Sequence, residues 1–192
     1  ATIANADEGA IYGVNTGFGD LAHTRVGKDS LQALQRNILV SHACGVGEDV
    51  PRIIVRAMLL LKIKSLSKGH SGVQLVTVER LLTHLNEDVL PVVPSQGSLG
   101  ASGDLAPLSH LVLPLIGEGE LVVDGAVVPA ATVLKAKGWD PIELGAKEGL
   151  ALINGTQLML GYGILAVQRM DKIAAWADAL CAWSLEAWNG RP

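Results

Sequence analysis

A chain of 192 residues is long enough for one compact domain and short for two. Hydrophobic residues make up 49% and charged residues 18%, which excludes a disordered chain, and the aromatic content of 4% favours helices over an aromatic-rich β-sandwich. The net charge of −4, without any basic run, disfavours binding to nucleic acid through its phosphates.

The first half of the chain predicts helices after a glycine-rich, irregular segment at 9–27. Asp29 or Ser30 would cap the first helix, and Pro51 would begin the second. The second is apolar almost all round, as expected of a helix at the centre of a bundle. The runs 31–39 and 75–86 have apolar residues at helical spacing, and the run 53–66 is the one that is apolar almost all round.

The second half predicts a loop, a hairpin and further helices. The stretch 94–104 contains too much glycine for a regular element, and a helix at 105–116 follows it with Asp104 as N-cap. Residues 121–128 predict the only strand pair, since their Asp-Gly turn suits the positive φ angles of a type I′ turn. Helices are expected again at 130–137, from about 148, and from 156 to 188.

Together these elements predict an all-α fold, a helical bundle with one small hairpin, as a single domain over 1–192. The uncharged stretch 149–168 has the length of a membrane span. Asn154, Thr156 and Gln157 would make it a poor one, so no membrane partner is expected.

Cysteine usage and the N-terminus bear on the compartment. Cys44 and Cys181 have no CxxC or Cys/His spacing around them, which predicts reduced, packed thiols of a cytoplasmic protein and no metal site. The first residues lack the basic and apolar regions of a secretory signal. The chain also lacks an initiator Met, so we expect it to begin inside a longer protein.

The glycine-rich stretch 97–104 admits three interpretations. A flexible turn is the plainest, and a phosphate cradle would need the GxxxxGK[ST] pattern and a preceding strand. In the third, the amide nitrogen of Gly103, unhindered by a side chain, attacks the carbonyl carbon of Ala101, and loss of water closes a five-membered ring. Loss of a second water from Ser102 then leaves an exocyclic methylidene, which is an electrophile.

Four segments, in the same order along the chain, resemble the ammonia-lyases that make such a methylidene-imidazolone group, the histidine and aromatic amino-acid lyases. The matching segments are YGVNTGFG at 12–19, QRN and SHA within 35–43, the loop at 97–107 and EGLALINGTQ at 148–157. The resemblance extends to the C-terminus and is nearest to the members that act on histidine. It implies the helical lyase fold, with residues 1–192 as a single N-terminal catalytic-domain fragment of a longer subunit. It also implies Ala101, Ser102 and Gly103 as the precursor of the electrophile, with no added cofactor or metal.

The resemblance also implies roles for four further residues. Asp104 would assist ring formation, and Tyr12 would remove a proton from the β-carbon of the substrate, for which it needs an activating environment. Asn154 would bind the substrate carboxylate or the ring oxygen, and His42 would select the substrate. From the residues alone, Tyr12 would be a loop aromatic against the core, Asn154 a helix N-cap and His42 a core histidine.

The function implied by the resemblance is elimination of ammonia from L-histidine, a small amino-acid substrate, to give trans-urocanate in a cytoplasmic homotetramer. A tyrosine ammonia-lyase or a related aminomutase is the alternative, since His42 would also suit a phenol. A third possibility is a helical fragment or interaction module without turnover, because members of the family are much longer. We further expect the chain alone to expose apolar surface along the helix from 156 and to self-associate.

Overall fold

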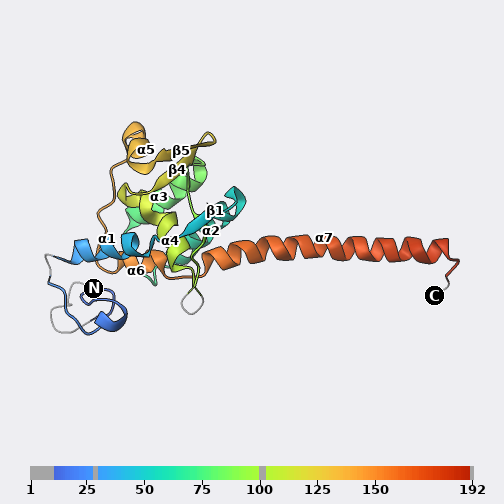
Figure 1. Ribbon diagram of the computed structural model, residues 1–192, viewed down its shortest axis with the longest axis horizontal. Helices are drawn as coiled ribbons and strands as arrows, with labels where there is room; N and C mark the ends of the chain where they lie inside the picture. The colour runs from blue at the N-terminus through green and yellow to red at the C-terminus, as the bar shows by residue number, and fades with distance from the viewer. Residues whose placement is uncertain (1–10, 28–29, 100–102, 191–192) are drawn as a thin grey trace.

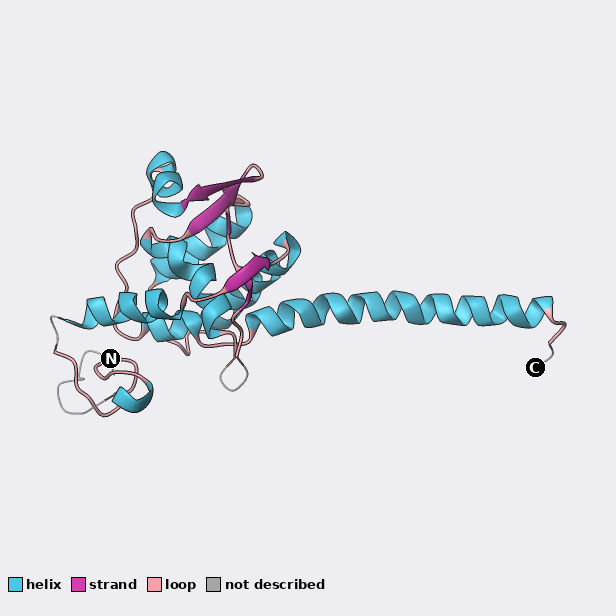
Figure 2. Cartoon of the chain, viewed as in Figure 1, coloured by secondary structure: helices cyan, strands magenta, loops and turns pink. Residues whose placement is uncertain are grey.

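The computed structural model describes residues 11–27, 30–99 and 103–190, which form helices, short loops and two small sheets (Figures 1 and 2). A body built from the first six helices and the strands carries the seventh as a single projecting rod (Figure 1). The all-α prediction is confirmed. The α-helices are α1 Leu31–His42, α2 Arg52–Leu66, α3 Leu75–Asn86, α4 Leu105–Val112, α5 Ala130–Lys137, α6 Glu148–Ile153 and α7 Gln157–Ala187.

Proline and glycine set some of the helix boundaries. Pro51 stands at the N-cap position of α2, and Gly138 ends α5 in the left-handed conformation that glycine adopts without strain. The helix predicted at 105–116 is α-helical only to Val112 and continues as a 3-10 turn, Leu113–Ile116. Pro114, which has no N–H to donate to the preceding turn, accounts for the change. Ser30 occupies the N-cap position of α1 without a side-chain cap bond, and Asp29 lies outside the described residues.

The predicted hairpin forms between β4 (Glu120–Val123) and β5 (Ala126–Pro129). Asp124 and Gly125 both have positive φ angles, as the Asp-Gly pair predicts. β2 (Leu90–Pro91) pairs antiparallel with β4 and completes a three-stranded sheet.

A second sheet pairs β1 (Val46–Asp49) with β3 (Pro94–Gln96). The prediction of a single strand pair was therefore wrong, as was that of an unbroken loop from residue 94. Strands this short contain too few alternations of apolar and polar residues to be distinguished from loops in a sequence.

Two apolar clusters hold the body together. The larger lies among α1, α2, α3, α4 and α6, and α2 packs against both α3 and the first turns of α7. α1 and α4 each pack against α6, so the start of α4 lies beside the junction between α6 and α7. The smaller cluster lies beneath the hairpin and consists of Val89, Leu121, Ala130, Val133 and Leu134.

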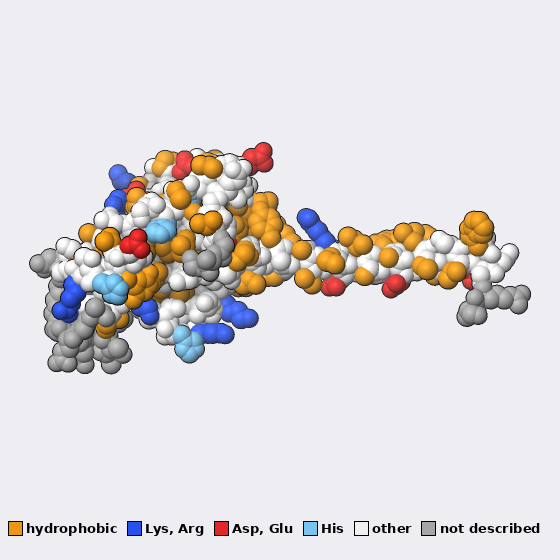
Figure 3. All heavy atoms as spheres, turned by 60° about the horizontal axis from the view of Figure 1, so that its bottom comes forward, with side chains coloured by type: hydrophobic (Ala, Val, Ile, Leu, Met, Phe, Trp, Pro, Cys, Tyr) orange, Lys and Arg blue, Asp and Glu red, His pale blue; other side chains and the backbone are white. Residues whose placement is uncertain are grey.

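Most of α7 lies outside the body. In this helix, all of which the structure describes, only Gln157, Leu158 and Gly161 are buried. Apolar side chains gather along the projecting part, as Figure 3 shows, and they include Met170, Ile173, Trp176, Leu180 and Trp183. The predicted exposure of apolar surface along this helix is confirmed. Within the described residues, no helix combines the length and apolarity needed to cross a membrane.

Both cysteines are free thiols, and both are exposed. Cys44 follows the end of α1, and Cys181 lies on the projecting part of α7. The prediction that they are packed was wrong, because neither position faces the body.

Candidate active site

Gly103 and Gly155 bring the two most informative sequence segments into contact. The two residues form an isolated parallel β-bridge, and the N–H of Asp104 donates to the carbonyl of Gly155 over 2.9 Å. Gly103 has a φ of +95°, and a methyl group at its position would overlap the Gly155 oxygen. Only glycine therefore fits here, which agrees with a ring-forming role for Gly103. Ala101 and Ser102, the other two predicted precursors, lie outside the described residues.

Asp104 is fully buried and fixes this contact from the other side. Its Oδ2 accepts from the N–H groups of Leu158 at 2.8 Å and Met159 at 3.1 Å, and its Oδ1 accepts from Ser98 Oγ at 2.7 Å. Asp104 stands at the N-cap position of α4 as predicted, but its side chain caps α7 and not its own helix. A carboxylate at this place satisfies two otherwise unpaired N–H groups and interacts favourably with the positive end of the helix dipole.

Asn154 is the C-cap of α6, and its side chain is exposed. The N-cap interpretation was wrong, because Thr156 occupies that position of α7. The Asn154 carbonyl accepts a hydrogen bond from Lys62 Nζ at 3.2 Å. Asn154 lines a cavity of about 230 Å³ together with His70, Ser71, Lys147, Leu150 and Ala151. Its side-chain amide is thus accessible to a ligand.

Tyr12 and His42 lie on other elements. Tyr12 is 50% exposed in the N-terminal loop and packs edge-on against Phe18, with 5.9 Å between ring centroids. His42 is partly buried in the last turn of α1, where its Nδ1 lies 2.8 Å from the Ile38 carbonyl oxygen. Within the described part of the chain, no hydrogen bond or ring contact joins either side chain to Asp104 or Asn154.

Gln35 is a residue to which the sequence assigned no role. It is fully buried in α1, where its Nε2 donates to the Gly13 carbonyl at 3.3 Å and its Oε1 accepts from the Gly149 N–H at 3.0 Å. One amide thus connects the loop that bears Tyr12 to the helix that ends at Asn154. The QRN triplet was recognised only as part of a matching motif, and its position on a helix of mixed polarity gave no sign of burial.

Lys62 was also missed. It is 1% exposed, although it lies in a run that is otherwise mostly apolar. Burial lowers the pKa of Lys62 to about 8, and the Asp104 carboxylate acts in the opposite direction. Its place three residues after Leu59 and four before Leu66 is the sequence feature that could have indicated a buried cation.

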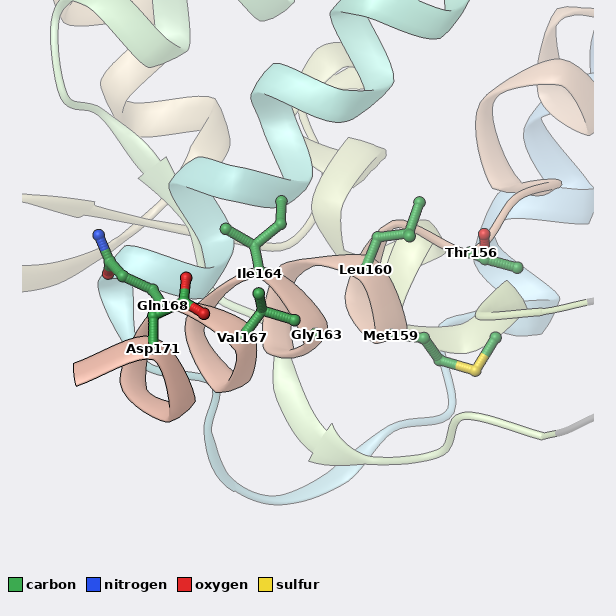
Figure 4. Close-up of a pocket in the computed structure, with 8 residues that line it drawn as sticks. All are labelled: Thr156, Met159, Leu160, Gly163, Ile164, Val167, Gln168 and Asp171. Carbon is green, nitrogen blue, oxygen red and sulfur yellow. The ribbon is translucent and has the colours of Figure 1, made fainter. Parts of the chain in front are cut away.

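A groove of about 700 Å³ begins beside this site and follows the first turns of α7 (Figure 4). Figure 4 shows its side chains projecting from successive turns of the helix. Asp171 is the only ionisable residue among those that line it, so the groove offers an apolar surface and little chemistry. Among the residues that the structure describes, no group of three His, Cys, Asp or Glu side chains is arranged to hold a metal ion.

The helical fold, the position of Gly103 that only glycine can occupy and the buried Asp104 carboxylate agree with the class of helical lyases that the sequence resembles. The sequence pattern of the aromatic amino acid lyase family matches residues 1–192, and the chain belongs to that family.

Curated relatives of the chain are histidine ammonia-lyases. That of Bacillus subtilis (strain 168) is 50% identical over 184 residues, which cover 96% of this chain and 36% of the relative. That of Deinococcus radiodurans is 54% identical over 180 residues, which cover 94% of this chain and 34% of the relative. The chain therefore spans about a third of the length of these relatives.

Solved structures of two different enzymes are similar to this chain. The crystal structure of histidine ammonia-lyase from Trypanosoma cruzi has a TM-score of 0.86 and 42% identity, covering 99% of this chain and 37% of that one. The structure of tyrosine aminomutase from Streptomyces globisporus has a TM-score of 0.87 and 43% identity, covering 97% and 35%.

Proposed function

We propose that the chain is the N-terminal part of an ammonia-lyase subunit that converts L-histidine to trans-urocanate and ammonia. The single observation that carries the proposal is the contact between Gly103 and Gly155 beside the buried carboxylate of Asp104. Gly103, a position that only glycine can occupy, thus lies next to the Asp104 carboxylate, which accepts a hydrogen bond from the start of α7. The identity of about 50% to histidine ammonia-lyases supports histidine as the substrate.

The electrophile is proposed to form from Ala101, Ser102 and Gly103. Once formed, the methylidene-imidazolone group would accept the substrate amine and make it a better leaving group. The residues that the structure describes fit this role, because Gly103 has no side chain to hinder its nitrogen and a positive φ that bends the chain. Asp104, held by Ser98, Leu158 and Met159, fixes the end of the bent segment.

Tyr12 is proposed as the base that takes the β-proton, and Asn154 as the residue that binds the carboxylate or the ring oxygen. Both side chains are accessible, at 50% exposure for Tyr12. They lie on separate elements connected through Gln35 and α6, so other parts of the subunit or other copies would complete the site. Assembly as a cytoplasmic homotetramer belongs to the same proposal.

A tyrosine ammonia-lyase or aminomutase is the second candidate, and the geometry of His42 is compatible with it. The Nδ1 atom lies near the Ile38 carbonyl oxygen and Ser41 Oγ; in the tautomer with its proton on Nδ1, the ring donates to that carbonyl and presents Nε2 as an acceptor. An imidazole N–H and a phenol O–H are both donors, so His42 suits either substrate. The similarity to tyrosine aminomutase agrees with this candidate.

The test is an assay of the complete subunit with L-histidine and L-tyrosine in parallel. We expect urocanate from histidine, measured by its ultraviolet absorbance, with little product from tyrosine. Formation of p-coumarate or β-tyrosine without urocanate would overturn the histidine assignment and support the second candidate.

We also expect residues 1–192 alone to show little or no turnover, because the chain spans only about a third of the length of the histidine ammonia-lyases to which it is similar. Sustained urocanate production by the purified chain would contradict this expectation. Intact mass spectrometry gives an independent check on the electrophile, since ring closure and dehydration together remove two water molecules.

A further inference from the structure

Lys62 occupies a position in α2 where an apolar side chain would be expected. It lies on the same buried stripe as Met58, Leu59 and Leu66, and it is 1% exposed. Removing an ammonium from water is costly unless the charge is paired and hydrogen-bonded. Lys64, two residues further along the same helix, is exposed and carries no such cost. The burial of Lys62 therefore requires an explanation from its surroundings.

Those surroundings are the two segments that meet at the candidate active site. Lys62 Nζ donates to the carbonyl of Asn154 at 3.2 Å, which is the residue before Gly155. The Asp104 carboxylate raises the pKa of the same ammonium, against the lowering by burial, so the two charges attract each other, although no ion pair or hydrogen bond joins these two described residues. The two buried charges thus act on the two chain segments that the bridge between Gly103 and Gly155 joins.

We propose that Lys62 is a positioning residue for the electrophile: its buried ammonium binds the Asn154 carbonyl and attracts the nearby Asp104 carboxylate, and thereby keeps Gly103 against Gly155. The role in electrophile formation rests on the proposed function, whereas the role in holding the two segments together does not. Lys62 acts through Asp104 and Asn154.

Without the ammonium, one group loses its hydrogen-bond partner and a second loses a nearby opposite charge. The Asn154 carbonyl loses its donor, and the Asp104 carboxylate remains buried with its hydrogen bonds but without the opposite charge. A buried group left without its partner costs more than the hydrogen bond itself contributed. The expected result is a looser contact between the two segments, while the rest of the body is unchanged.

Amide hydrogen exchange on residues 1–192 tests the positioning role directly. The reporters are the N–H of Asp104, which donates to Gly155, and those of Leu158 and Met159, which donate to the Asp104 carboxylate. In Lys62→Met we expect these amides to exchange roughly tenfold to a hundredfold faster. Lys62→Arg keeps the positive charge and should restore much of the protection.

Two controls distinguish a local effect of Lys62 from a general loosening of the fold. Lys64→Met removes a lysine from the exposed side of the same helix and should leave the reporters unchanged. The amides of Gln74 and Gly145, which donate to the buried carboxylate of Glu148, report on the rest of the fold. Unchanged reporters in Lys62→Met, equal acceleration in Lys64→Met, or equal loosening at Gln74 and Gly145 would each overturn the proposal.

A second measurement covers the case in which Lys62→Met does not fold. The pKa of Lys62 in the unsubstituted chain, followed by NMR of its ε-methylene group, is expected near 8. Asp104→Asn removes the opposite charge and should lower this pKa further. A pKa of Lys62 that is the same with and without the Asp104 charge would overturn the proposed coupling.

Intact mass spectrometry of the complete subunit tests whether Lys62 contributes to formation of the electrophile. The fraction of chains that have lost two water molecules should be lower in Lys62→Met than in the unsubstituted protein. In Lys62→Arg this fraction should return towards the unsubstituted value. Equal dehydration in Lys62→Met would remove the link to electrophile formation. If the unsubstituted subunit loses no water, the electrophile of the proposed function is disproved, while the exchange experiment still decides whether Lys62 holds the two segments.

Discussion

At the scale of single residues, Gly103 is a position where any side chain would overlap its neighbour, so substitution there should be strongly destabilising. Gly103→Ala would force a side chain into the Gly155 carbonyl at a φ of +95°. We expect a loss of roughly 3 kcal/mol in the free energy of unfolding, and no loss of water from the chain. Urea denaturation and intact mass measure the two effects.

Gly163→Ala is the matched control. A methyl group there meets no atom within 4 Å, and the residue lies within α7. Alanine is the better helix former, so this variant should be neutral or more stable by up to about 1 kcal/mol. Equal destabilisation by the two substitutions would show that the contact between Gly103 and Gly155 is not the cause.

The burial of His84 predicts that the folded chain is less stable in acid. His84 is buried in α3, its Nδ1 lies 2.9 Å from the Val89 carbonyl oxygen, and burial is the main cause that lowers its pKa from 6.5 to about 4. Between these values the unfolded chain binds a proton that the folded chain does not. The free energy of unfolding should therefore fall by about 3 kcal/mol as the pH drops from about 6.5 to 4.

Chemical denaturation at several pH values, compared with His84→Gln, checks this prediction. The variant should lose the part of the pH dependence that His84 causes, whereas substitution of the exposed His23 should leave it intact. The same acid sensitivity in His84→Gln would show that other groups are responsible.

The candidate site was only partly predictable from its residues. Gly103 follows from the local Ala-Ser-Gly pattern, whereas the site roles of Asp104 and Asn154 came from the resemblance to the lyases; the structure brings the segments that carry these residues into contact. Lys62 and Gln35 were missed because their burial depends on which segments pack against them. The N-cap interpretation of Asn154 failed for a similar reason, since Asn154 and Thr156 are both typical cap residues and only the end of α6 distinguishes them.

At the scale of elements, the start of α7 depends on a residue from another part of the chain. Asp104→Ala would leave the N–H groups of Leu158 and Met159 without their acceptor. We expect a loss of about 1–3 kcal/mol in stability and fraying of the first turn. Circular dichroism and amide exchange of Leu158 and Met159 measure it.

Glu79→Ala is a suitable comparison, because Glu79 is an exposed carboxylate within α3. It should change stability by less than about 0.5 kcal/mol. If Asp104→Ala is equally mild, the hydrogen bonds to α7 contribute little, and the helix begins without help from Asp104.

The helices were more predictable than the strands. Pro51 and Gly138 each act within a few residues of their own position, so their effect can be seen in the sequence, and the one strand pair that was predicted has a local Asp-Gly turn. The pairing of β1 with β3 joins segments that are far apart in the chain, and nothing local marks either strand. The side chain of Asp104 likewise acts on α7 and not on α4, which no local pattern indicates.

At the scale of the whole molecule, the projecting part of α7 governs behaviour in solution. Thirty-one residues at 1.5 Å each make a rod of about 46 Å, most of it with exposed apolar side chains. We expect residues 1–192 to self-associate as the concentration rises, with sedimentation masses above the monomer value of 20.1 kDa.

The double substitution Ile173→Glu with Trp176→Glu should shift the protein towards the monomer, since both side chains are exposed on the projecting part. Val127→Glu, at an exposed apolar position on β5, is the control and should have little effect. A monodisperse monomer of the unsubstituted chain at every concentration would contradict the expectation.

The bond between Asp104 and α7 also has a consequence for the order of folding. The N-terminal turn of α7 receives its acceptor from a residue 54 positions earlier in the chain. The stability of this turn therefore depends on a long-range contact, whose formation carries the entropic cost of closing the intervening loop. This end of the rod gains its full stability only after Asp104 has docked, so the assembly of the site and the start of the longest helix are coupled.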